Sequence, residues 1–279
     1  MKEKIKKTLK IIFLLAIVLT IVMYWFDQYN YYFGEYYEHT FECPFESNVA
    51  LIKIQGEIMT YGTELVDPES SETISEDIAS SETVVDYINQ IEEDDYMKAI
   101  IVEIDSYGGS PVASEEIMNA LKRAAKPTIA VIREGAASGA YLIASAADRI
   151  YASEVSDVGS IGVTISYLDY SQQNNKEGII YQQLSSGKFK DTGDPNKELT
   201  AEEKELFMRD INILHEAFVK RVAENRGLDI EKVEKLADGS TMLGKAAKEN
   251  GLIDEIGDIY SAEEWIRKEL KIEPEICVF

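Results

Sequence analysis

Histidine and cysteine are scarce in this chain of 279 residues, which contains two of each. Cys43 and Cys277 show no CxxC or Cys/His spacing, so the sequence offers no zinc site. Their separation is compatible with a disulfide in an oxidising compartment and equally with two free thiols. Basic residues are outnumbered, with 28 Lys and Arg against 51 Asp and Glu. A net charge of −23 leaves no broad basic surface for phosphates, so nucleic acid is not an expected partner.

The N-terminus departs from this acidic character. Five lysines fall within the first ten residues, and the 16 residues from 11 to 26 carry no charge. With Leu9 and the stem of Lys10, this run approaches the roughly 20 residues that span a bilayer. We therefore expect a cytoplasmic basic tail at residues 1–8 and a transmembrane anchor at residues 9–27. Because lysines stay on the cytoplasmic side, the rest of the chain is expected on the outer side of the cell membrane.

Bulky residues follow the apolar run where a signal peptide would need small ones. This favours an uncleaved, single-pass anchor over the alternative, a cleaved signal peptide. Residues 28–47, rich in tyrosine and acidic side chains, predict a juxtamembrane stalk. A globular domain is expected at residues 48–279, because 45% hydrophobic residues suffice for a core and NVALIKIQGEI predicts a first strand ending at Gly56.

Strands alternate with helices inside this domain. Residues 66–82 are rich in Ser, Glu and Asp and predict a mobile loop, and SETVVDYINQI predicts the helix that follows. AIIVEI, from Ala99, then predicts a strand before a glycine turn and a helix that is capped by Ser110 and begins at Pro111. The plan is then repeated: TIAVIRE predicts a strand, GAASG a turn, AYLIASAA a helix and RIYAS another strand. The alternation predicts an α/β fold with parallel pairing.

Small residues surround Ser138 in the stretch GAASGAYLIASAADRI. A serine at a strand-to-helix turn presents its hydroxyl outward near a helix N-terminus, and small neighbours leave room for a substrate carbonyl. Gly108 and Gly109 end another strand, and their N–H groups can complete an oxyanion hole. The alternative is a tight helix–sheet contact with a capping serine and an ordinary glycine turn.

A serine nucleophile needs a base, and neither histidine is well placed to be one. His39 lies in the predicted stalk, and His215 falls just off the apolar stripe of a long helix. We expect that stripe to be buried and His215 to be structural or solvated; the stripe consists of Phe207, Ile211, Leu214, Phe218 and Val222. The candidate base is therefore a lysine that desolvation keeps neutral.

Five motifs follow one another along the domain: DSYGGSPVASEEI at 105–117, GAASGAYLIASAADRIYAS at 135–153, VGSIGV at 158–163, SSGKFKD at 185–191 and ADGSTMLGKAAKENGLIDEIG at 237–257. In order and spacing over residues 48–262 they resemble a known family, the signal peptide peptidase A group of Ser/Lys peptidases. The resemblance implies a ClpP/crotonase-like fold with repeated β-β-α units after one N-terminal transmembrane helix.

The resemblance also implies roles for particular residues. Ser138 matches the nucleophile, and Lys190, in the SGxxKD motif, matches the general base. Ser160, in GSIG, matches a serine that hydrogen-bonds and orients the lysine. The N–H groups of Gly109 and Gly139 would form the oxyanion hole. No cofactor or metal is implied.

The chain departs from the family pattern in places that leave these groups intact. Tyr107 stands where a proline is usual, so the oxyanion turn loses a fixed φ and gains a ring that can line the cleft. Ala140 stands where a glycine is usual, and Lys188 is out of register for the base. Arg133 is expected to pair with its neighbour Glu134.

The function implied is a membrane-anchored serine endopeptidase that cleaves peptides, with remnant signal peptides as the expected substrates. The family's short form assembles into homo-oligomers in which serine and lysine can come from neighbouring subunits. Three alternatives stay open: an acyl-CoA enzyme of the crotonase type, a catalytically inactive protein, and a related peptidase specific for one membrane protein.

Overall fold

The computed structural model describes residues 18–20, 22–25, 43–44, 46–62, 65–66, 73–74 and 78–279. The chain divides into two units, residues 1–43 and 44–279. In the first unit, residues 18–20 and 22–25 are helical. Among the described residues, no helix is both long and apolar enough to cross a bilayer. The predicted tail, most of the predicted anchor and most of the predicted stalk lie outside the described residues.

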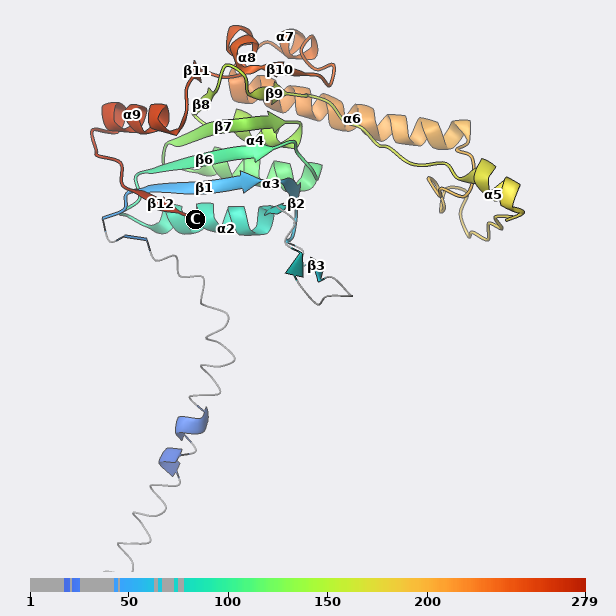
Figure 1. Ribbon diagram of the computed structural model, residues 1–279, viewed down its shortest axis with the longest axis horizontal. Coiled ribbons are helices and arrows are strands. Elements are labelled where there is room, and N and C mark those ends of the chain that lie inside the picture. Colours follow the sequence, from blue (N-terminus) through green and yellow to red (C-terminus); the bar gives the residue numbers. More distant parts are fainter. Residues whose placement is uncertain are drawn as a thin grey trace, which may run out of the picture. The chain divides into compact units, whose positions relative to one another are not determined.

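The second unit is built on an eight-stranded, mainly parallel sheet (Figure 1). The strand order is β10-β9-β7-β6-β1-β12, and β8 joins β7 to β11. Only the pairing of β9 with β10 is antiparallel among the described pairs of this sheet. The strands are β1 (Val49–Gln55), β6 (Ala99–Ser106), β7 (Thr128–Ala137), β8 (Arg149–Ala152), β9 (Asp157–Gly159), β10 (Thr241–Leu243), β11 (Glu255–Ile256) and β12 (Ile276–Val278). The prediction of an α/β fold is confirmed.

Helices cover both faces of this sheet. On one side α2 (Ser81–Glu93), α3 (Pro111–Arg123) and α4 (Gly139–Ser145) pack together and against the strands. On the other side Ala262 and Ile266 of α9 (Ile259–Leu270) pack in a cluster with Val49 and Leu51 of β1. The intervening β1 residues, Ala50, Ile52 and Ile54, are also fully buried. Burial on both faces explains why the strands are continuous apolar runs.

Local signals place the turn before α3 as predicted. The Ser110 side chain caps α3 by accepting a hydrogen bond from the Ala113 N–H at 3.4 Å, and Pro111 is the first helical residue. β7 differs from the prediction, because it continues through the expected GAASG turn as far as Ala137. Its second half leaves β8 and pairs with β9, from Gly135 opposite Asp157 to Ala137 opposite Gly159.

The predicted mobile loop at residues 66–82 contains regular structure where it is described. β2 (Glu57–Met59) pairs with β5 (Ile78–Ser80), and β3 (Leu65–Val66) pairs with β4 (Thr73–Ile74). α2 begins at Ser81, so the end of the predicted loop is already helix. The pairing with β2 was not visible in the sequence, because β2 lies about twenty residues upstream.

α6 (Ala201–Arg226) extends from the sheet toward α5 (Ser171–Glu177) (Figure 1). We call residues 164–200, which contain α5, the arm. The two short helices α7 (Ile230–Glu234) and α8 (Gly244–Asn250) follow α6. Only the C-terminal part of the predicted apolar stripe is buried, at Phe218 and Val222, where α6 packs on α4. Toward its N-terminus α6 leaves the core, and Leu214 is 38% exposed, so the prediction of a fully buried stripe was wrong.

A buried hydrogen bond joins α4 to the segment after α8. The hydroxyl of the fully buried Tyr141 donates to the Leu252 carbonyl at 2.8 Å. Tyr141→Phe leaves that carbonyl without its partner and is expected to lower the free energy of unfolding by about 1–2 kcal/mol. Chemical denaturation monitored by circular dichroism measures the change. A loss below ~0.3 kcal/mol would show that this bond contributes little to stability.

Candidate active site

Ser138 lies between β7 and α4 in a strained backbone conformation, with φ 54° and ψ −126°. Positive φ is uncommon outside glycine and is typical of functional turns. Its N–H donates to the Gly159 carbonyl at 2.8 Å, and its own carbonyl accepts the Leu142 N–H at 3.1 Å. Within the described part of the chain, the Ser138 hydroxyl makes no capping hydrogen bond to α4. The alternative of a capping serine is therefore not what the structure shows.

The two glycine turns lie directly against each other. A Cβ added to Gly108, which has φ 103°, would lie 2.9 Å from the Gly139 nitrogen. A Cβ added to Gly139 would lie 3.6 Å from the Gly109 nitrogen and 2.2 Å from Ser114 Oγ. Gly139 is the first residue of α4, so its N–H has no intrahelical acceptor. The turns that carry the predicted oxyanion hole are thus adjacent, and glycine is required for their close approach.

β2 holds the Gly109 turn in place. Ile58 donates its N–H to the Gly108 carbonyl at 3.0 Å and accepts the Ser110 N–H at 2.7 Å. A Cβ on Gly109 would lie only 2.1 Å from the Ile58 carbonyl oxygen. The prediction from sequence had no role for Ile58, because its contact with the turn depends on a strand pairing between distant segments.

Ser160 is the fourth predicted site residue in this region. It also has positive φ, 49°, and its hydroxyl donates to the Gly239 carbonyl at 2.9 Å. Its N–H donates to the Ser240 carbonyl at 2.9 Å. The pairing of Ser138 with Gly159 therefore holds Ser138 and Ser160 next to the same stretch of β9.

A cleft of about 740 Å³ opens over these turns. It brings together four of the five predicted site residues, namely Gly109, Ser138, Gly139 and Ser160. Apolar side chains from α4 and α6 form part of its wall: Leu142, Ile211, Leu214 and Phe218. His215, which was expected to be structural or solvated, is half buried and lines the same cleft. Within the described residues, no group of three or more His, Cys, Asp or Glu could hold a metal ion.

Lys190 is the predicted site residue that a single subunit does not bring to the cleft. Of the residues that the structure describes, it is not among those that line the cavity. It is exposed, and it lies in the arm, which meets α6 at the end away from the sheet (Figure 1). Lys188, two residues earlier, forms an exposed ion pair with Glu202 at 2.6 Å.

Tyr107, which stands in place of the usual proline, lines the cleft with 59% of its surface exposed. Its ring covers Gly135, where an added Cβ would lie 3.2 Å from the ring. Loss of hydration raises the pKa of Tyr107, and the nearby carboxylates of Glu134, Asp157 and Asp105 raise it further. The phenol is therefore a neutral hydrogen-bonding group in the cleft that Ser138 also lines.

Arg133 pairs with Glu103 at 2.9 Å and not with Glu134 as predicted. Glu103 is opposite Val131 in the β6–β7 register, and Arg133 is two residues beyond Val131 on the same face. Glu134 lies where the β6–β7 register shifts, between the pairs Ile104–Ile132 and Ser106–Ala136. Arg133 therefore pairs with a residue on the neighbouring strand and not with the residue next to it in sequence.

The fold is that of an α/β chain, and comparison with known proteins places the chain in a peptidase family. Residues 120–273 match the model of peptidase family S49, so the chain belongs to that family. It is 33% identical over 211 residues to a putative signal peptide peptidase SppA of Enterococcus faecium, covering 75% of this chain and 61% of that protein. The predicted resemblance to signal peptide peptidase A is confirmed.

Two further relatives carry protease names. A putative protease of Methanocaldococcus jannaschii is 38% identical over 175 residues, covering 62% of this chain and 56% of that protein. The chloroplastic serine protease SPPA of Arabidopsis thaliana is 32% identical over 217 residues, covering 77% of this chain and 31% of that protein. The chain thus spans about three fifths or less of the length of these relatives.

Proposed function

We propose that this chain is a membrane-anchored serine endopeptidase that uses a Ser138–Lys190 dyad. The observation that carries the proposal is the strained Ser138 turn, which lies at a cleft beside Gly109, Gly139 and Ser160. A nucleophile needs an exposed hydroxyl, and an anionic intermediate needs converging N–H donors next to it. In our proposal Ser138 supplies the hydroxyl, and Gly109 and Gly139, which line the same cleft, supply the N–H donors.

In this mechanism Ser138 Oγ attacks the carbonyl carbon of a peptide bond while the neutral amine of Lys190 takes the hydroxyl proton. The N–H groups of Gly109 and Gly139 stabilise the oxyanion of the tetrahedral intermediate. The protonated lysine then passes its proton to the leaving amine, which leaves an acyl-enzyme on Ser138. Water, deprotonated by the same lysine, hydrolyses the ester and restores the serine. Ser160 orients the lysine amine.

The lysine of each dyad comes from a neighbouring subunit in our proposal. The arm that carries Lys190 is outside the cleft of its own chain, and it exposes several large apolar side chains. Ile179, Ile180, Leu184 and Phe189 are 52%, 77%, 98% and 40% exposed. Packing of the arm against a second copy would bury these side chains and remove water from the amine, which favours its neutral form. The active species is therefore a homo-oligomer.

The substrate we propose is an extended peptide with small or apolar side chains, such as a signal-peptide remnant. Leu142, Ile211 and Phe218 give the cleft an apolar wall suited to such residues. A transmembrane anchor at residues 9–27 would hold the domain beside the outer face of the membrane, where such remnants lie. Both cysteines are disulfide-bonded, which supports an oxidising, extracytoplasmic location.

Covalent labelling tests the nucleophile. The full-length chain in detergent micelles is treated with a serine-directed acylating agent, and the modified residue is located by peptide mass spectrometry. We expect a single adduct on Ser138 and none on Ser160, together with loss of peptide hydrolysis. An adduct on another residue, or no adduct on an oligomer that cleaves peptides, would refute the assignment.

The match to peptidase family S49 favours this proposal over an acyl-CoA enzyme. An inactive protein would give neither label nor hydrolysis. A peptidase dedicated to one membrane protein would take the label on Ser138 but leave apolar model peptides uncut.

A further inference from the structure

The segment that carries Lys190 has little regular structure to hold it. Residues 178–200 connect α5 to α6 without a helix or strand, although every one of them is described. A loop of this length keeps one shape only when its side chains fix it. The position of Lys190 must therefore depend on contacts inside the arm.

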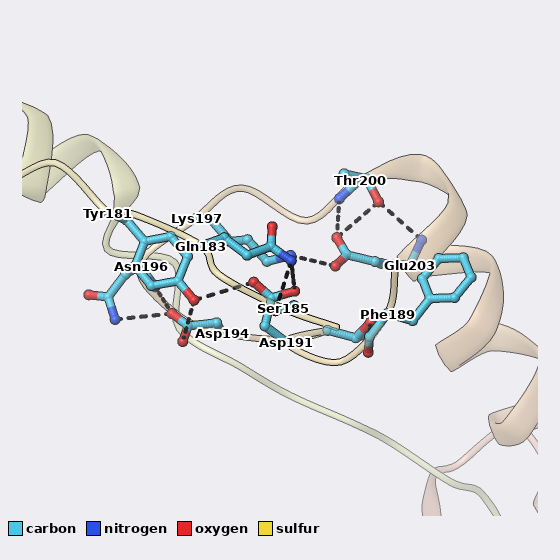
Figure 2. Close-up of polar contacts among 11 residues, drawn as sticks. Tyr181, Gln183, Ser185, Phe189, Asp191, Asp194, Asn196, Lys197, Thr200 and Glu203 are labelled. Atoms are coloured by element: carbon cyan, nitrogen blue, oxygen red, sulfur yellow. Dashed lines mark hydrogen bonds and ion pairs between the residues drawn. The ribbon is translucent and has the colours of Figure 1, made fainter. Parts of the chain in front are cut away.

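A compact ionic cluster supplies such contacts (Figure 2). Lys197 Nζ lies 2.6 Å from Glu203 Oε1 and 3.1 Å from Asp191 Oδ1. The three side chains are 18%, 3% and 13% exposed in the order Lys197, Glu203 and Asp191, so this is the most enclosed ion-pair cluster of the arm. Breaking an enclosed cluster costs far more than breaking a surface pair, because it leaves a charge without its partner.

Glu203 fixes one end of the cluster to α6. Its Oε2 accepts hydrogen bonds from the N–H and the hydroxyl of Thr200, each at 2.9 Å, and completes the capping box that begins the helix. The Lys197 ammonium and the Thr200 N–H lower the pKa of Glu203 to about 2. Glu203 is therefore ionised throughout the working range of pH and remains a fixed anchor.

Asp191 fixes the other end, directly after Lys190. It accepts hydrogen bonds from Gln183 Nε2 at 2.6 Å and from the Tyr181 hydroxyl at 3.3 Å. These bonds turn the Asp191 side chain into the arm, while Lys190 is exposed. The chain of contacts from α6 through Glu203, Lys197 and Asp191 ends at the residue next to Lys190.

We propose that Lys197, held between Asp191 and Glu203, is a positioning residue that fixes the turn presenting Lys190 to the cleft of a neighbouring subunit. The inference rests on the proposed role of Lys190 as the base. It assigns no direct contact with substrate to Lys197. Its effect should appear in the chemical step and leave substrate binding unchanged.

Kinetics of Lys197→Met in the full-length oligomer test the proposal. Small displacements of a reacting group cost large factors in rate, so kcat for a fluorogenic apolar peptide should fall at least about tenfold with KM unchanged. Lys188→Met is the matched control, because Lys188 pairs with α6 through Glu202 but is 62% exposed. It should keep kcat within about twofold, since exposed pairs contribute little. Melting temperature and oligomer mass are measured for both variants.

Mixed oligomers separate positioning from general damage. Co-assembly of Lys197→Met with Ser138→Ala should recover activity, because the Ser138→Ala subunits supply an intact arm and the Lys197→Met subunits supply an intact Ser138. Co-assembly with Lys190→Met should recover none, because both variants are defective in the arm. A kcat for Lys197→Met equal to that of Lys188→Met, or recovery with Lys190→Met, would overturn the positioning role.

A failure of the proposed role of Lys190 as the base would give a different result. If Lys190→Met alone is fully active, Lys190 is not the base and both proposals fall. If Lys190→Met is inactive while Lys197→Met behaves like Lys188→Met, only the positioning role falls.

Discussion

Ser138→Ala is expected to lower kcat/KM for peptide hydrolysis by roughly 10⁴-fold or more, because the acyl-enzyme cannot form without the Oγ nucleophile. The variant should fold normally, since alanine at φ 54° is no more strained than serine and the hydroxyl caps nothing in the described structure. Single-turnover and steady-state hydrolysis of a fluorogenic peptide measure the loss.

Ser153→Ala is the matched control for this variant. Ser153 is exposed, and its hydroxyl accepts a weak bond from the Val155 N–H at 3.4 Å, so removal of that hydroxyl should leave kcat/KM unchanged. Activity of Ser138→Ala within tenfold of the unmodified chain, measured with a purified oligomer free of other proteases, would disprove the nucleophile.

Lys190→Met should be the second most damaging change, with a loss of roughly 10³-fold or more in kcat/KM. The hydroxyl then lacks the base that takes its proton, and general-base contributions are of order 10²–10⁴. Methionine preserves the length and apolar stem of lysine, so the arm can still pack. Hydrolysis rates are measured for Lys190→Met and Lys188→Met under the same conditions. The comparison separates the effect of losing the Lys190 amine from the effect of losing a nearby positive charge.

The same variant tests the junction between subunits. In a 1:1 mixture with Ser138→Ala, about a quarter of the junctions combine an intact serine with an intact lysine if the two groups come from different chains. Activity should therefore return to about that fraction. No recovery would place both groups in one chain. Full activity of Lys190→Met, together with inactivity of His215→Ala, would instead assign the base to the histidine in the cleft wall.

Much of the fold follows from local signals. Ser110 and Pro111 predicted the start of α3, and the alternation of apolar runs with turns predicted the parallel sheet. The extension of β7 to Ala137 was not predictable, because its partner β9 lies about twenty residues downstream. The burial of α6 was misjudged for a related reason. A helical period shows which residues share a face, but it does not show how far a neighbour covers that face.

The candidate site was likewise predictable where it depends on local sequence and not where it depends on contacts between distant segments. Glycine turns predicted the Ser138 region, and the cleft gathers Gly109, Gly139 and Ser160 around it. The surroundings of Lys190 could not be predicted from one chain, because in our proposal Lys190 lies at the interface with a neighbouring subunit. Lys197 was missed altogether. The sequence TAEE at residues 200–203 predicts a capping box, but nothing in it predicts that Glu203 also binds a lysine.

α6 joins two parts of the molecule that serve different sites in the proposed oligomer. One end packs on α4 with Phe218 and Val222 buried, and the other end anchors the arm through Glu203. Its 26 residues form a rod about 39 Å long, which transmits a tilt at one end to the other. A peptide that displaces α6 in the cleft of one subunit would therefore also move Lys190 of that subunit, which acts in the cleft of its neighbour. Neighbouring sites in the proposed oligomer would then be coupled, so that turnover at one site would alter the rate at another.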